Sequence, residues 1–137
     1  MRRWLVFFLA LCCGCSAGEL RKEFFGLNPQ DVRQSNHAYV ATLEGTADKC
    51  FSQALDELRG MKAVARAVNR KKKFVVARQF DGVFKSCIDT TEAALLFTAE
   101  GTRTTKLTVV SDNHNLAEYV CAAMAARLGK NVSARKN

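Results

Sequence analysis

The strongest constraint on the fold is a pair of segments rich in threonine, valine and leucine that flank a short polar connection. The segments are residues 93–99 (Ala-Ala-Leu-Leu-Phe-Thr-Ala) and 104–110 (Thr-Thr-Lys-Leu-Thr-Val-Val), and residues 100–103 (Glu-Gly-Thr-Arg) join them. β-Branched and aliphatic residues favour strands, and a short connection that contains glycine is typical of a β-hairpin. The sequence therefore predicts an antiparallel sheet.

Three further segments carry strand patterns. Alternating apolar residues predict a strand that begins near His37 and ends at Gly45. Residues 61–68 and 73–80 predict two more strands, and residues 69–72 (Asn-Arg-Lys-Lys) supply the polar connection between them. The alternation in these two segments is imperfect, so the prediction of a second hairpin depends on the turn signal between them.

Two segments have the spacing of amphipathic helices. Thr46 can cap a helix that ends at Gly60, and the polar residues 111–113 can cap a second helix from about His114 to Leu128. In each helix the apolar residues recur every three or four positions and form one core-facing stripe. The stripes contain Phe51, Ala54, Leu55 and Leu58 in the first helix and Ala117, Val120, Cys121, Met124 and Leu128 in the second.

The order of these segments predicts the fold class. A strand, a helix, a run of strands and a final helix pack as an α+β two-layer sandwich, with both helices on one face of an antiparallel sheet. A chain of 137 residues, 48% of them hydrophobic, fits one domain. We expect that domain to span residues 37–129 and to be followed by a polar tail at residues 130–137.

The first residues have the pattern of a secretory signal. Arg2 and Arg3 precede the apolar residues 4–12, and small residues follow up to Ser16. A helix that spans a bilayer needs about 20 apolar residues, and this run is shorter. We therefore interpret residues 1–14 as a signal peptide that is removed on export.

The end of the apolar run resembles the lipobox of bacterial lipoproteins. Gly14 precedes Cys15, as a small residue precedes the lipidated cysteine in that family, although Cys12 stands where leucine is usual. The resemblance implies that Cys15 carries the lipid, with Cys13 as a competing acceptor. Ser16 follows Cys15, and the family's sorting rule then implies anchorage at the periplasmic face of the outer membrane.

Residues 15–36 lack a sustained period and contain the single proline, so we interpret them as the lipidated N-terminus and a tether. An alternative is that Cys12, Cys13 and Cys15 form a metal or redox cluster in a protein that is not exported. No second cysteine cluster downstream would complete a tetrahedral site, which favours the lipoprotein interpretation.

Three cysteines lie in the rest of the chain. In an oxidising periplasm, Cys50 and Cys87 are the favoured pair for one possible disulfide, with Cys121 left over. In the alternative, all three are small buried hydrophobic residues, and the place of Cys121 on an apolar helix face fits that interpretation. The sequence leaves both open.

Cys87 also suggests a different function, a small envelope thiol enzyme or hydrolase in which His114 is the base and Asp89 or Asp112 orients it. No spacing in the sequence brings these residues together. Downstream of Cys15 the chain has no zinc, calcium or nucleotide-binding motif, and His37 and His114 lie far apart along it. We therefore expect no catalytic residue, no metal site and no cofactor.

Positive charge is concentrated in the hairpin predicted at residues 61–80. The net charge of the chain is +8, and it falls to +6 when the signal peptide leaves with its two arginines. Six cations near its turn and along its strands are Arg66, Arg70, Lys71, Lys72, Lys73 and Arg78. They predict a patch for an anionic membrane surface or an acidic partner. In the alternative they form a solvated turn that also protects a sheet edge.

These observations favour a non-enzymatic binding or accessory domain that is attached to the membrane by an N-terminal lipid. A strand–helix–strands–helix order behind a lipobox is similar to that of small periplasmic lipoprotein domains of unknown function. The expected partners are the membrane and an envelope protein or polymer, and nucleic acid is not expected. A basic nucleic-acid-binding protein is the second alternative if the chain is not exported.

Overall fold

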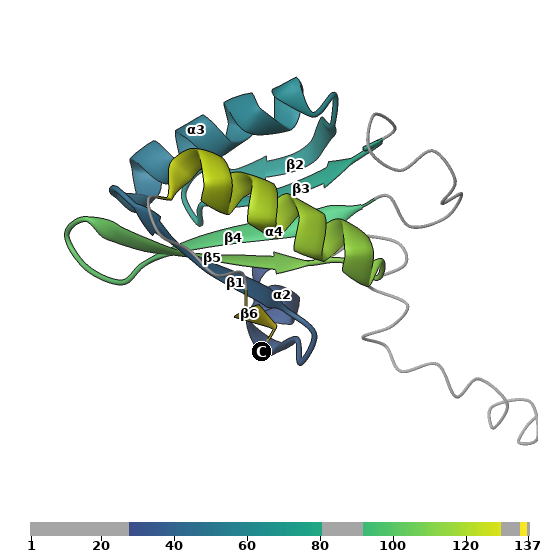
Figure 1. Ribbon diagram of the computed structural model, residues 1–137, viewed down its shortest axis with the longest axis horizontal. Helices are drawn as coiled ribbons and strands as arrows, with labels where there is room; N and C mark the ends of the chain where they lie inside the picture. Colours follow the sequence, from purple (N-terminus) through teal and green to yellow (C-terminus); the bar gives the residue numbers. More distant parts are fainter. Residues whose placement is uncertain (1–27, 81–91, 130–134, 137) are drawn as a thin grey trace, which may run out of the picture.

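A computed structural model describes residues 28–80, 92–129 and 135–136, which form an antiparallel sheet with helices on both faces (Figure 1). The strand order is β2-β3-β4-β5-β1-β6. The elements are α2 (Pro29–Gln34), β1 (Tyr39–Glu44), α3 (Ala47–Gly60), β2 (Val64–Asn69), β3 (Phe74–Arg78), β4 (Ala93–Ala99), β5 (Thr104–Val110), α4 (His114–Leu128) and β6 (Arg135–Lys136). The predicted α+β class and the predicted order of elements are confirmed.

The β4–β5 hairpin lies in the middle of the sheet and has the bounds predicted from the sequence. Its register pairs Ala94 with Val110 and Ala99 with Thr105. At the turn, the backbone N–H of Glu100 donates to the carbonyl oxygen of Thr104 at 3.0 Å. Both strands are flanked by others, because β3 pairs with β4 and β1 pairs with β5.

The helices α3 and α4 cover one face of the sheet (Figure 1). The side chain of Thr46 caps α3 by accepting from the backbone N–H of Lys49 at 3.4 Å, and Asn113 caps α4 through the N–H groups of Asn115 and Leu116. Side-chain oxygens at these positions satisfy amides that have no partner inside the helix. The predicted apolar stripes lie in the core between the helices and the sheet, where Leu128 is partly buried.

The opposite face of the sheet carries a second buried cluster. It contains Val32, Ala38, Phe74, Val76, Ala94, Leu96 and Val110. Successive residues of a strand point to opposite faces, so β3 and β4 contribute to both clusters. This burial on both faces explains the imperfect alternation in residues 73–80, because neither face of β3 needs polar residues.

The helix α2 packs on this second face and corrects the predicted domain limits. It lies within the range 15–36 that the sequence predicted to be a tether, and its Val32 is buried against β4 and β5. At the other end of the chain, Arg135–Lys136 pairs with β1 instead of belonging to a polar tail. The packed elements therefore extend beyond residues 37–129 on both sides, and α2 covers the face of the sheet opposite the predicted pair of helices.

Candidate functional site

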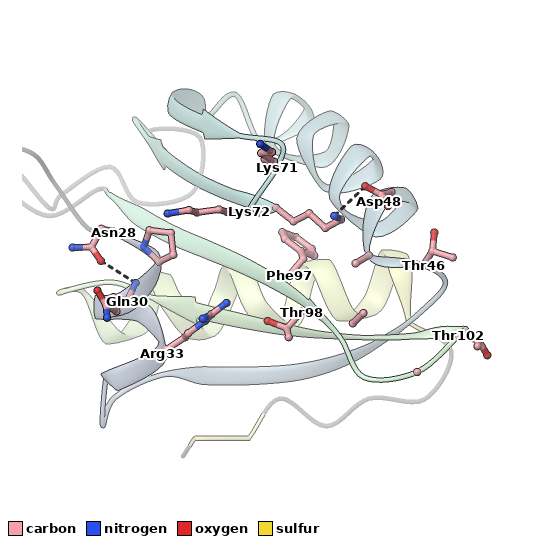
Figure 2. A pocket seen from close by; sticks show the side chains of 15 residues that line it. Asn28, Gln30, Arg33, Thr46, Asp48, Lys71, Lys72, Phe97, Thr98 and Thr102 are labelled. Carbon is pink, nitrogen blue, oxygen red and sulfur yellow. Dashed lines mark hydrogen bonds and ion pairs between the residues drawn. The ribbon is translucent and has the colours of Figure 1, made fainter.

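A hollow of about 870 Å³ opens at one end of the sheet, between four segments that are distant in sequence (Figure 2). The segments are the start of α2, the β2–β3 turn, the start of α3, and the end of β4 with the following turn. The lining residues are Asn28, Pro29, Gln30, Arg33, Thr46, Ala47, Asp48, Lys71, Lys72, Lys73, Phe97, Thr98, Ala99, Gly101 and Thr102. We call this the basic hollow.

The β2–β3 turn is held in place by its own hydrogen bonds. The side chain of Asn69 accepts from the backbone N–H of Lys72 at 2.9 Å, and the carbonyl oxygen of Arg70 accepts from the N–H of Lys73 at 3.3 Å. The carbonyl oxygen of Lys73 accepts from the N–H of Phe97 at 3.0 Å, which ties the turn to β4. These bonds hold three consecutive lysines at the rim of the basic hollow.

The balance of charge in the basic hollow is positive. Lys73 Nζ lies 3.2 Å from Asp48 Oδ1 in the first turn of α3, and the Lys73 side chain is 25% exposed (Figure 2). Within the described part of the chain, Arg33, Lys71 and Lys72 form no ion pair with a carboxylate. Lys71 and Lys72 are exposed. Three cations are therefore available to an anion in the hollow.

The side of the basic hollow formed by α2 depends on the cap of that helix. This helix was not among the elements predicted from the sequence. The Asn28 side chain accepts from the N–H groups of Gln30 and Asp31 at 2.8 and 3.1 Å, and Asp31 Oδ2 accepts from the Asn28 N–H at 3.1 Å. Asparagine at the cap, Pro29 at the first helical position and an acid three residues after the cap are a helix-start signal that could have revealed this helix. It places Arg33 in the hollow.

The structure divides the cationic patch that the sequence predicted. Lys71, Lys72 and Lys73 line the basic hollow. Arg78 lies at the other end of the hairpin, opposite Val64. At ~3.3 Å per residue, it is about 16 Å from Lys73 along the strand. Beside that end, Arg66 pairs with Glu92 at 3.0 Å. The structure therefore separates Arg66 and Arg78 from the turn lysines, and Arg33 lines the same hollow as those lysines.

The cysteine predictions are only partly accessible to the structure. Cys50 is a buried free thiol whose Sγ lies 3.5 Å from the carbonyl oxygen of Glu44, and Cys121 is a buried free thiol on α4. Burial raises the pKa of the Cys121 thiol from 9.0 to about 12. Cys87, the predicted disulfide partner, and Cys15, the predicted lipid acceptor, lie outside the described residues, so both assignments stay predictions.

The two histidines, far apart in sequence, are neighbours in the fold. The ring centroids of His37 and His114 are 5.3 Å apart, and the ring planes meet at 74°. Both side chains are exposed. The described residues contain no group of three or more histidine, cysteine or acidic side chains that could hold a metal ion. Asp89 lies outside these residues, as does Cys87, so the thiol-enzyme hypothesis also stays untested.

The basic hollow has the chemistry of an anion-binding surface. Its cations and the hydroxyl groups of Thr46, Thr98 and Thr102 can bind phosphate or carboxylate oxygens. Its apolar wall includes Phe97, which is buried, and Pro29. Among the helices that the structure describes, none is long and apolar enough to cross a bilayer. No protein-family model and no curated protein matches the chain.

Proposed function

We propose that the protein is a lipid-anchored lipoprotein of the cell envelope, at the periplasmic face of the outer membrane, whose domain binds an anionic component of the envelope without catalysing a reaction. The observation that carries the binding part is the convergence of Arg33, Lys71 and Lys72 on one hollow without ion-pair partners among the described residues. The anchoring part depends on the lipobox-like segment that ends at Cys15.

The geometry favours an anion presented at a surface rather than one small enclosed ligand. The residues that line the basic hollow come from four separate segments, and two of its cations, Lys71 and Lys72, come from an exposed turn (Figure 2). Each lysine or arginine held near an anionic surface contributes about 1 kcal/mol, and the effect fades within a Debye length of about 8 Å in physiological salt. A lipid anchor would keep the domain close enough to envelope phosphates and carboxylates for this weak term to matter.

The anchor is tested by the intact mass of the protein after expression in a Gram-negative host. We expect the membrane-extracted chain to lack residues 1–14 and to carry the added mass of acyl chains, and a Cys15→Ser variant to lack both changes. A Cys13→Ser variant is the matched control and should mature normally. An unmodified full-length mass for the native chain in the soluble fraction would contradict the anchor.

The binding function is tested with the mature protein, purified from membranes and placed in phosphatidylcholine nanodiscs, titrated with fluorescent polyglutamate and separately with polyphosphate. We expect Lys71→Ser with Lys72→Ser to weaken binding roughly tenfold to thirtyfold, because two contributions of about 1 kcal/mol are lost. Arg66→Ser with Arg78→Ser removes the same charge from the other part of the hairpin and should change binding by less than about threefold. The polymer that binds more tightly identifies carboxylate or phosphate as the preferred anion.

Equal losses in the two double variants would mean that only the net charge matters, and the assignment to the basic hollow would then be wrong. Rising salt should weaken binding of the native protein, because the interaction is between exposed charges. Binding that does not respond to salt would contradict the electrostatic proposal in the same experiment.

A further inference from the structure

A second hollow, of about 550 Å³, lies between α3 and the edge strand β2. Its lining residues are Leu55, Leu58, Arg59, Ala63, Ala65, Val68, Asn69, Arg70 and Lys71. The floor consists of aliphatic side chains from the helix and the strand, whereas the charged members are all cations. We call it the edge groove, and it shares only Lys71 with the basic hollow.

The strand beside the edge groove is the most exposed strand in the described part of the chain. β2 ends the sheet, and all six of its residues are exposed. Val64 is 48% and Val68 45% exposed, and among the described residues no other large hydrophobic side chain is as exposed, Tyr119 coming next at 41%. Exposed valines on an unpaired strand edge present apolar surface and backbone hydrogen-bonding groups together, which is the arrangement used in strand addition.

The two exposed valines point to opposite faces of the sheet. Val68 pairs with Val75, which belongs to the core cluster under α3, so Val68 faces the edge groove. Val64 pairs with Arg78, and alternation along β3 places that pair on the face of Phe74. Equal exposure on opposite faces makes these residues a matched pair for an experiment.

The rim of the edge groove selects the charge of an occupant. Arg70 and Lys71 form no ion pair with a described carboxylate, and Arg59 pairs with Asp56 at 2.6 Å on the exposed side of α3. An aliphatic floor gives no hydrogen bonds to a sugar or a phosphate group. The occupant therefore needs apolar groups for the floor and negative charge for the rim.

We propose that the edge groove is the docking site for an extended polypeptide segment of a partner protein that alternates aliphatic and acidic residues. The segment lies along β2, and its aliphatic side chains enter the groove beside Val68. Alternate residues of a strand point to opposite faces, so its carboxylates lie on the other side of the segment, where the long, exposed side chains of Arg70 and Lys71 at the turn reach them. The β-bulge between Ala65 and Ala67 interrupts the regular edge, so backbone pairing is confined to the turn-proximal end of β2. This site is independent of the lipid anchor.

The test uses the full-length protein in mild detergent and fluorescein-labelled peptides. The probe is a short peptide that alternates valine with glutamate, and its controls alternate serine with glutamate and valine with lysine. We expect fluorescence anisotropy to show binding of the valine–glutamate peptide at least about tenfold tighter than that of either control. Equal binding of the serine–glutamate peptide would reduce the interaction to charge attraction and overturn the proposal.

Two valine variants then locate the site. Val68→Ser should weaken binding of the valine–glutamate peptide roughly tenfold, and Val64→Ser should leave it within about twofold, with unchanged circular dichroism for both. Equal losses in the two variants, or none in either, would overturn the assignment to this groove. Lys72 lies outside the edge groove, so Lys72→Ser should leave the affinity for the valine–glutamate peptide unchanged. Failure of this proposal is therefore distinguishable from failure of the anion-binding one.

Discussion

The two hairpins of the sheet differ in what surrounds them. The β4–β5 hairpin lies between other strands, and five of the seven side chains of β4 are buried. The β2–β3 hairpin ends the sheet, and its outer strand has no buried residue. The first hairpin can hold the fold together, whereas the second offers side chains to other molecules. The difference predicts that stability and binding respond to mutations in different hairpins.

The largest effect is expected from a cavity in the central hairpin. Leu107 is fully buried in β5, so Leu107→Ala should lower the free energy of unfolding by about 2–5 kcal/mol. Val68→Ala, in the exposed strand β2, should change it by less than about 0.5 kcal/mol. Urea denaturation followed by circular dichroism measures both. A similar loss of unfolding free energy in the two variants would show that both hairpins contribute equally to stability.

A smaller effect is expected at two positive backbone angles, one beside each hairpin. Gly45 has φ 123°, where only glycine is relaxed, and its N–H donates to the carbonyl oxygen of Arg103 in the β4–β5 turn at 2.7 Å. The Thr105 hydroxyl donates to the Gly45 carbonyl oxygen at 2.9 Å, so the backbone has little freedom to adjust. Gly45→Ala should therefore cost about 1–3 kcal/mol in the same denaturation experiment.

Lys73 is the contrasting position, because its φ of 50° lies in the left-handed helical region that lysine can occupy at modest cost. Lys73→Gly relieves that cost and removes a partly exposed ion pair with Asp48, so the net change should be less than about 1 kcal/mol. If Lys73→Gly proved as damaging as Gly45→Ala, the turn of the outer hairpin would be part of the stabilising framework.

The sequence predicted elements whose signals are local. The caps Thr46 and Asn113 and the apolar stripes of both helices lie within a few residues of the segments that they define, and so does the turn of the central hairpin. The apolar period missed α2 because six residues are too few to show one, although the cap at Asn28 was a local signal for its start. It missed β6 because two residues form a strand only when β1 lies beside them, so a tertiary contact decides that element.

The candidate site was predictable only in its lysines. Lys71 and Lys72 form a visible charge run, but Arg33 reaches the same hollow from a helix whose existence the sequence analysis did not propose. Arg66 and Arg78 are close to the lysines in sequence, and the sequence therefore predicted one group. In the structure, the length of the β2–β3 hairpin separates these two arginines from the turn lysines. The edge groove had no signal at all, since its floor combines α3 with β2.

A further predicted effect concerns pH and the buried side of the molecule. Cys121 lies in the core beneath α4, which packs on β1, β4 and β5, and burial raises the pKa of its thiol from 9.0 to about 12. The unfolded chain releases this proton above pH 9 while the folded chain retains it, so the stabilisation is complete below pH 9 and is lost as pH rises toward 12. About one unit above pH 9, the loss is ~1.4 kcal/mol.

Urea denaturation at pH 8 and at about pH 10 measures this loss, and the comparison with Cys121→Ala isolates it from other groups that titrate. The native chain should lose ~1.4 kcal/mol more than Cys121→Ala between the two values of pH. Val68→Ala keeps the thiol and alters only the exposed strand, so its pH dependence should equal that of the native chain. A Cys121→Ala variant with the native pH dependence would mean that the thiol is accessible to water, and the central half of the sheet would then be less protected than its packing implies.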